Sequence, residues 1–328
     1  MNTVAGTIGK LCEFIKIELR GLYPDPEISS LTDIIISHLF EIPKHEIHIK
    51  KDEPVSERDS TRFINIVNEL KTGKPVQYIL GCTEFFGLKL RVTPDVLIPR
   101  PETEELVKWI IDDFSRKPVS ILDIGTGSGC IAIALKKFLK NSNIHGCDIS
   151  VPALEIAHEN ARSNSVEVLF YHLDISAILT SKPGEIIHND IFWSSKTRNK
   201  GNHNSMEITD SDQIDIKTNH GLNKLHDLIV SNPPYIPLSE KSSININVTG
   251  FEPGIALFVP DDDPLLFYRH IALFGSDHLK KNGQIYLEIH ENSGPSVKKL
   301  LEEHGYRQVT IRSDINGKDR MIKCFKYG

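Results

Sequence analysis

The 328-residue sequence has few cysteines and no long apolar segment. Its five cysteines are widely spaced and form no C-x-x-C pair, which argues against a disulfide framework and against a zinc site. No apolar run approaches the roughly 20 residues that a membrane helix needs. Acidic Glu13 and Glu18 lie among the early basic residues, where a transit peptide avoids acids. These absences predict a soluble, cytoplasmic protein without a metal site or a membrane partner.

An excess of positive charge is also absent. The chain has 38 Lys and Arg against 44 Asp and Glu, which gives a net charge of −6. A protein that holds a long stretch of phosphate backbone needs a basic surface, so nucleic-acid binding is not expected. The length predicts one catalytic domain with a smaller appendage.

Residues 1–74 are predicted to form a small helical domain that docks a substrate. Apolar residues recur there at spacings of three and four, from Ile8 to Leu22 and again from Phe63 to Leu70. Ser56 is a suitable N-cap for the second of these helices, and Gly73 is a suitable C-terminal stop.

Residues 75–98 are predicted to be a linking β-hairpin, because short β-like runs surround Gly81 and Gly87. From residue 99 to 328, apolar runs alternate with helical stretches, which predicts an α/β domain with a mostly parallel, doubly wound sheet. The dipeptide Asn316-Gly317 signals a final antiparallel hairpin. Residues 194–225 are polar with little to bury, so they are predicted to be a flexible surface insertion. The predicted strands cover residues 119–124, 144–148, 166–171, 227–231 and 284–289, and the predicted helices cover residues 102–114, 129–140, 152–163, 264–281 and 295–305.

A glycine-rich run, Asp-Ile-Gly-Thr-Gly-Ser-Gly, lies between the first of these strands and its helix, at residues 123–129. Only glycine lets a backbone turn this sharply while its amides face a ligand. Such turns also serve dinucleotides or packing alone. Ile131 stands where the dinucleotide fingerprint needs Gly or Ala, which favours S-adenosylmethionine, a cofactor without a pyrophosphate. The loop residues predicted to contact this cofactor are Gly125, Thr126, Gly127, Ser128 and Gly129.

Acidic residues end the next two strands. Asp148 comes about 20 residues after the loop, where a carboxylate can bind both ribose hydroxyls of a nucleoside. Asp174 is placed to accept a hydrogen bond from the adenine amino group, and Asp190 is a competing candidate. Either of these two could equally be a solvated loop acid.

The sequence Asn232-Pro233-Pro234-Tyr235 follows strand 227–231, at the carboxyl edge where open α/β sheets bind ligands. A rigid turn is one interpretation, since Pro-Pro ends any strand. Chemistry supplies another, because an amide nitrogen shares its lone pair with its carbonyl and is a poor nucleophile. The side-chain oxygen of Asn232 and the main-chain oxygen of Pro233 can accept both N–H bonds and favour the tetrahedral nitrogen.

Tyr235 can stack on the planar acceptor and align it with a sulfonium methyl group. We therefore predict Asn232, Pro233 and Tyr235 as catalytic residues, and all four motif residues, Pro234 included, as the substrate-binding set. Asn232 is also expected to face the cofactor.

These motifs resemble one family, the protein-glutamine methyltransferases of peptide chain release factors known as HemK or PrmC. The resemblance rests on TPDVLIPRPETE (residues 93–104), the glycine loop, Asp148 and SNPPYI (residues 231–236). The N-P-P-Y motif is shared with DNA, RNA and protein methyltransferases, whereas I-P-R-P-E-T-E ahead of the loop is typical of this family.

The resemblance implies a Rossmann-like, seven-stranded methyltransferase sheet with an N-terminal helical domain that helps dock the release factor. It also implies a reaction: S-adenosylmethionine methylates the side-chain amide nitrogen of the glutamine in the Gly-Gly-Gln motif of class I release factors.

Two other functions stay open. A nucleic-acid adenine methyltransferase faces the same lone-pair problem, but it needs a base-flipping pocket and basic strand contacts, which the net acidity disfavours. A release-factor-binding module without catalysis is disfavoured by the intact Asn232 and glycine loop. Arg100 and Glu102 either line the active-site entrance or pin the hairpin.

Overall fold

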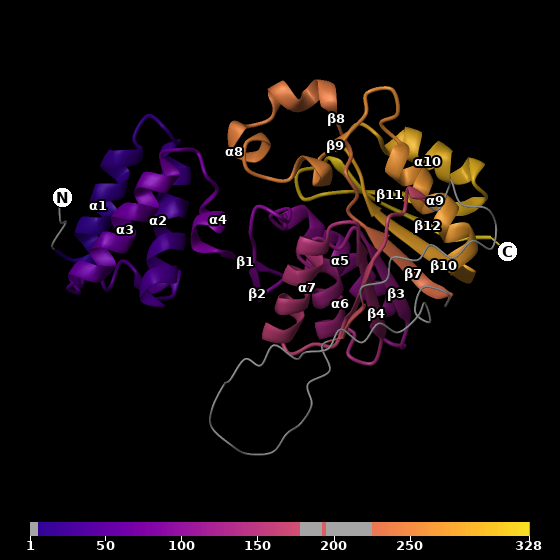
Figure 1. The fold of residues 1–328 in the computed structure, drawn as a ribbon, viewed down its shortest axis with the longest axis horizontal. Coiled ribbons are helices and arrows are strands. Elements are labelled where there is room, and N and C mark those ends of the chain that lie inside the picture. The colour runs from indigo at the N-terminus through magenta and orange to yellow at the C-terminus, as the bar shows by residue number, and fades with distance from the viewer. Residues whose placement is uncertain (1–5, 178–191, 195–224, 328) are drawn as a thin grey trace, which may run out of the picture. The chain divides into compact units, whose positions relative to one another are not determined.

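The computed structural model describes residues 6–177, 192–194 and 225–327 (Figure 1). Asp190 and nearly all of the predicted insertion, residues 195–224, lie outside them. The chain divides into two compact units, Met1–Cys82 with Asn245–Phe251, and Thr83–Ile244 with Glu252–Gly328. The predicted docking role of the N-terminal segment stays a prediction. No helix in the described ranges has the length and apolar character needed to cross a membrane.

The first unit is helical and buries the predicted apolar stripes except at Leu22, which lies beyond the first helix and is 58% exposed. Leu11, Ile15 and Phe63 are fully buried in one cluster. The predicted N-cap is confirmed, because Ser56 Oγ accepts a hydrogen bond from the Asp59 backbone N–H at 3.1 Å. The helices of this unit are α1 Ile8–Leu19, α2 Asp25–Phe40, α3 Glu57–Leu70, α4 Val76–Leu80 and α8 Ile246–Thr249, with a 3₁₀ turn η1 at Lys44–Glu46.

Helix α4 corrects the expectation that residues 76–80 belong to the hairpin. Pro75 precedes the helix with φ −56°, which suits a helix start, and Gly81 ends it in the left-handed region with φ 71°. The hairpin is therefore shorter than predicted, with strands β1 Cys82–Phe85 and β2 Leu88–Arg91.

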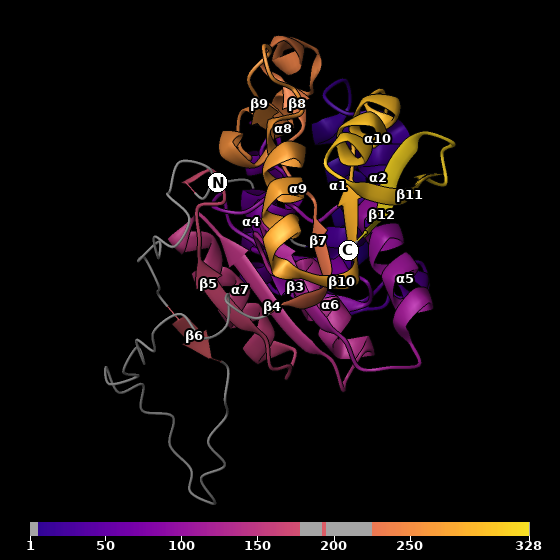
Figure 2. The same cartoon turned by 90° about the vertical axis from the view of Figure 1, so that its right-hand side faces the viewer.

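The second unit contains the predicted sheet. Strands β10, β7, β3, β4 and β5 are parallel neighbours, and β12 pairs antiparallel with both β10 and β11. These seven strands confirm the expected methyltransferase sheet. Strand β6 adds an antiparallel edge, so this sheet has eight strands among the described residues, in the order β11-β12-β10-β7-β3-β4-β5-β6 (Figure 2). Their bounds are β3 Ser120–Ile124, β4 Asn143–Asp148, β5 Leu169–His172, β6 Phe192–Ser194, β7 His226–Ser231, β10 Leu279–Glu288, β11 Tyr306–Ser313 and β12 Asp319–Lys326.

Helices cover both faces of this sheet, as a doubly wound fold requires. Ile121 of β3 packs into the cluster that includes α5, α6 and α7, whereas its neighbour Leu122 packs into the cluster that includes α9 and α10. Leu279, predicted to be helical, instead begins β10 and pairs with His226 of β7. The remaining elements are α5 Pro101–Phe114, α6 Cys130–Phe138, α7 Val151–Ser163, β8 Ile236–Pro237, η3 Leu238–Ser243, η4 Gly254–Ala256, β9 Phe258–Val259, α9 Leu266–His278 and α10 Gly294–Glu303.

Candidate active site

The glycine loop joins β3 to α6 and depends on its glycines. Gly125, Gly127 and Gly129 have φ values of 68°, 53° and 80°, a region that side chains with a Cβ rarely adopt. At Gly129 packing adds a second reason, since an added Cβ would lie 3.1 Å from the Ala157 Cβ atom. The Thr126 backbone N–H donates to the Cys147 carbonyl at 2.9 Å, which ties the loop to β4.

Asp148 ends β4 and supports the same loop. One of its carboxylate oxygens accepts the Gly127 N–H at 2.8 Å, and the other accepts the Ser150 N–H at 2.9 Å. Burial raises the pKa of Asp148, although these backbone N–H groups act in the opposite direction. Each carboxylate oxygen has a second lone pair, so the group can accept further bonds from a ligand.

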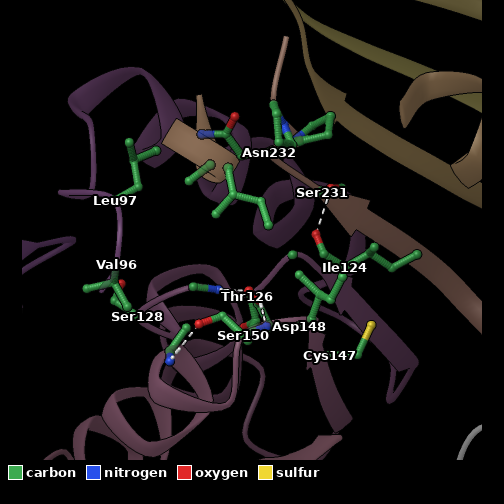
Figure 3. Close-up of a pocket in the computed structure, with 18 of the residues that line it drawn as sticks. Val96, Leu97, Ile124, Thr126, Ser128, Cys147, Asp148, Ser150, Ser231 and Asn232 are labelled. Carbon is green, nitrogen blue, oxygen red and sulfur yellow. Dashed lines mark hydrogen bonds between the residues drawn. The ribbon is translucent and has the colours of Figure 1, made fainter. Parts of the chain in front are cut away.

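A cavity of about 310 Å³ lies at the carboxyl ends of β3, β4 and β7 (Figure 3). Its wall brings together most of the predicted site residues, which are distant in sequence. The predicted residues on this wall are Gly125, Thr126, Gly127, Ser128, Asp148, Asp174, Asn232, Pro233 and Pro234.

Two predicted residues, Gly129 and Tyr235, are not among the described residues that line the cavity. Gly129 instead allows α6 to approach Ala157 of α7. Tyr235 packs beside the α9–α10 core cluster, and its hydroxyl donates to Glu288 Oε1 at 3.0 Å. Whether Tyr235 stacks on an acceptor stays a prediction, and in this structure its hydroxyl is bound to Glu288.

Asp174 is on the wall, and its Oδ1 accepts the Ser176 N–H at 2.8 Å. This bond orients the carboxylate within the turn that follows β5. The competing acid, Asp190, lies outside the described residues.

Hydrogen bonds fix the first residue of the Asn232-Pro233-Pro234-Tyr235 motif and the serine before it. Ser231 Oγ donates to the Ile124 carbonyl at 2.6 Å, which couples the end of β7 to the end of β3. Asn232 Nδ2 donates to Thr103 Oγ1 at 3.2 Å, whereas its Oδ1 accepts no hydrogen bond from the described residues. Asn232 thus presents an uncommitted acceptor at the cavity.

Two family models match parts of the chain: that of the PrmC N-terminal domain matches residues 15–81, and that of ribosomal protein L11 methyltransferase (PrmA) matches residues 101–192. The release factor glutamine methyltransferase of Flavobacterium psychrophilum is 38% identical over 309 residues, covering 93% of this chain and 94% of that protein. The protein of the same name from Bacteroides thetaiotaomicron is 35% identical over 315 residues, covering 96% and 99%. The chain belongs to the release factor glutamine methyltransferase family. Both the predicted resemblance and the predicted enzyme class, methyltransferase, are confirmed.

Among solved structures, the protein-(glutamine-N5) methyltransferase (release factor-specific) of Alicyclobacillus acidocaldarius is 23% identical. The structural match spans 73% of this chain and 100% of the A. acidocaldarius chain, with a TM-score of 0.37.

In this member of the release factor glutamine methyltransferase family, Arg100 lies at the cavity, and its partner is a buried acid outside the hairpin. It lines the cavity, and its guanidinium contacts Glu252 Oε1. Glu252 is 6% exposed, and its other oxygen accepts the Ile98 N–H at 3.1 Å. The pair therefore fixes the segment that enters α5. Glu102 is not among the described residues on the cavity wall.

Sequence reasoning missed three residues of the site: Thr103, Glu252 and Glu288. Glu288 carried a usable signal, because it ends an apolar strand at the carboxyl edge as Asp148 does. Thr103 belongs to the family-typical run at residues 93–104, but neither Thr103 nor Glu252 carried a signal of its partner, since the partners lie at sequence separations of 185 and 152 residues.

Proposed function

We propose that the protein transfers a methyl group from S-adenosylmethionine to the side-chain amide nitrogen of the glutamine in the Gly-Gly-Gln motif of class I release factors. One observation carries the proposal: Asn232 and Pro233 lie on the wall of the same cavity as the glycine loop and Asp148. Membership in the release factor glutamine methyltransferase family supports the choice of acceptor.

The charge of the cavity fits S-adenosylmethionine. Its charged wall residues are Asp95, Asp148 and Asp174 on the acidic side and Arg100, which pairs with Glu252, on the basic side. A net acidic wall suits a ligand with a sulfonium and an ammonium group and opposes the pyrophosphate of a dinucleotide. When bound, the cofactor supplies an electrophilic methyl group on sulfur.

The glycine loop and Asp148 would hold the nucleoside part. No described atom lies within 4 Å of a Cβ added at Gly125 or Gly127, so both positions leave room for a ligand against the backbone. Asp148 would accept hydrogen bonds from the ribose hydroxyls. Asp174 would accept one from the adenine amino group.

Asn232 and Pro233 would activate the acceptor. Accepting both amide N–H bonds stabilises the tetrahedral nitrogen more than the planar one, so the benefit is realised at the transition state. The free Oδ1 of Asn232 is suited to one of these bonds. Pro234 would shape the turn that aims them, and Tyr235, bound to Glu288, would hold the motif in place before any stacking on the substrate.

The test is a labelling experiment with three acceptors. Purified protein and methyl-labelled S-adenosylmethionine are incubated with a class I release factor, with its Gly-Gly-Ala variant and with double-stranded DNA. We expect label in the release factor and in neither of the other two. Label in DNA would favour the adenine methyltransferase, and equal label in the Gly-Gly-Ala variant would show that another residue is methylated.

A further inference from the structure

The carboxylate of Glu288 connects two parts of the acceptor site. Glu288 ends β10 and is 1% exposed. Its Oε2 accepts the Thr103 hydroxyl at 2.6 Å, and its Oε1 accepts the Tyr235 hydroxyl at 3.0 Å. A buried carboxylate with a hydroxyl on each oxygen is well placed to orient both donors.

The direction of these two hydrogen bonds determines the direction of the bond between Thr103 and Asn232. An ionised carboxylate can only accept, so the single hydroxyl hydrogen of Thr103 points to Glu288. The Thr103 oxygen then offers only lone pairs to Asn232, 3.2 Å away, and the Asn232 group that faces it must be the NH₂. The Asn232 oxygen is left for the cavity.

The orientation of the Asn232 amide needs to be fixed, because an asparagine amide has two nearly isosteric orientations. A flipped Asn232 would present N–H groups to the N–H groups of a substrate amide, which neither binds nor activates it. From this geometry we propose that Thr103 and Glu288 are positioning residues that hold the Asn232 side-chain oxygen toward the methyl acceptor. The inference rests on the proposed function, and it extends the site to Thr103, which lines the cavity, and to Glu288, which acts through Thr103.

Charged neighbours act on Glu288 in both directions. Its pKa is raised overall, because burial raises it most and the negative charge of Glu102 acts in the same direction. The hydrogen bonds from Thr103 and Tyr235 and the positive charge of Arg320 oppose this rise and act toward the ionised, accept-only form on which the orientation depends.

The first test compares Thr103→Val with Thr103→Ser. Valine keeps the shape but removes the hydroxyl, so turnover of release factor should fall about 10-fold or more, while the cofactor dissociation constant stays within about twofold. Serine keeps the hydroxyl and should retain most of the turnover. If the valine variant folds poorly, Thr103→Ala takes its place. It also lacks the hydroxyl, so its turnover should fall as well. Equal turnover of the valine and serine variants would overturn the inference.

A double-mutant cycle separates positioning from general damage. If Thr103 acts through Asn232, Asn232→Ala should reduce turnover by a smaller factor in the Thr103→Val background than in the wild type. Multiplicative effects of the two substitutions would contradict the inference.

A measurement without turnover keeps this inference distinct from the proposed function. In protein labelled with ¹⁵N-asparagine, the Asn232 NH₂ signal is assigned by its loss in Asn232→Ala. Its hydrogen exchange with water should be slow in the wild type and in Thr103→Ser and faster in Thr103→Val. Unchanged exchange in Thr103→Val would refute the orientation, whereas absent methylation by the wild type with the exchange pattern intact would refute only the proposed function.

Discussion

Asn232 is the residue whose replacement tests the chemistry most directly. Asn232→Ala removes the acceptor oxygen, so turnover should fall about 100-fold or more, as for one lost transition-state hydrogen bond. Asn232→Asp keeps an oxygen but loses the donor to Thr103 and adds a charge near Glu288, so its turnover should lie between wild type and alanine. Steady-state kinetics at saturating cofactor gives the order. Wild-type turnover in the alanine variant would contradict the proposed role of Asn232 and leave the motif as a structural turn only.

Asp148 should contribute mainly to cofactor affinity. Charge-assisted bonds to the ribose hydroxyls are worth roughly 1.5–3 kcal/mol each, and Asp148 also holds the Gly127 and Ser150 amides. We expect Asp148→Ala to weaken S-adenosylmethionine binding at least 10-fold, on the order of one such bond. Isothermal titration calorimetry measures this, and an unchanged dissociation constant would remove Asp148 from the site.

Asp123 should make the stability of the second unit depend on pH. Burial raises its pKa to about 7, against the hydrogen bond that its carboxylate accepts from Thr126. Since the folded pKa lies above the unfolded one, this group stabilises the fold at low pH, and the contribution is lost as pH rises from about 4 to about 7.

Asp123→Asn keeps an oxygen for Thr126 but cannot ionise. Relative to wild type, its free energy of unfolding should therefore improve between pH 5 and pH 8, by up to about 3 kcal/mol. Urea denaturation at the two pH values measures the difference, in which other acids cancel. A constant difference between variant and wild type would contradict the shifted pKa.

At the scale of elements, the glycine loop sets the distance between α6 and α7. Gly129→Ala places a Cβ at a φ of 80° and 3.1 Å from the Ala157 Cβ atom. The left-handed conformation alone costs about 1–2 kcal/mol for an alanine, and the contact adds to it, so we expect about 1–3 kcal/mol lost from the free energy of unfolding.

Gly254→Ala is the matched control for this prediction. An added Cβ there meets only Phe258 Cδ2 at 3.7 Å, an ordinary contact, and Gly254 has no positive φ. Urea unfolding followed by tryptophan fluorescence reports on the second unit, because both tryptophans, Trp109 and Trp193, belong to it. Equal losses in the two variants would contradict the close approach of α6 and α7.

At the scale of the whole molecule, the described residues that line the cavity all belong to the second unit. Saturation with S-adenosylmethionine should therefore slow amide hydrogen exchange around residues 123–131, 148–153 and 231–236, with little effect in α1 and α3. Hydrogen-exchange mass spectrometry with and without cofactor measures this. Asp148→Ala at the same cofactor concentration is the control and should show weaker protection. Equal protection in α1 and α3 would contradict a cofactor site confined to the second unit.

Much of this molecule was predictable from short segments. The α3 cap depends on Ser56 and Asp59, three residues apart, and the glycine loop depends on φ values that the glycines themselves permit. The strands and helices of the second unit follow from apolar runs and periodic stripes, because the spacing of apolar residues along the chain shows which face of an element is buried. The family resemblance likewise depended on contiguous motifs. The errors occurred where context decides, as at Leu279, which pairs with His226 rather than continuing a helix.

The sequence by itself therefore determined the sheet, the turn at the glycine loop and the place of the N-P-P-Y motif after β7, since each is encoded within a few neighbouring residues. Only the tertiary structure decided how that motif is held. The bonds from Asn232 to Thr103 and from Thr103 to Glu288 join residues 129 and 185 positions apart. The Tyr235 hydroxyl donates to the same carboxylate. A hydrogen bond needs its partners within about 3 Å and in the right direction, and for residues this distant only the packed sheet and helices can bring them there.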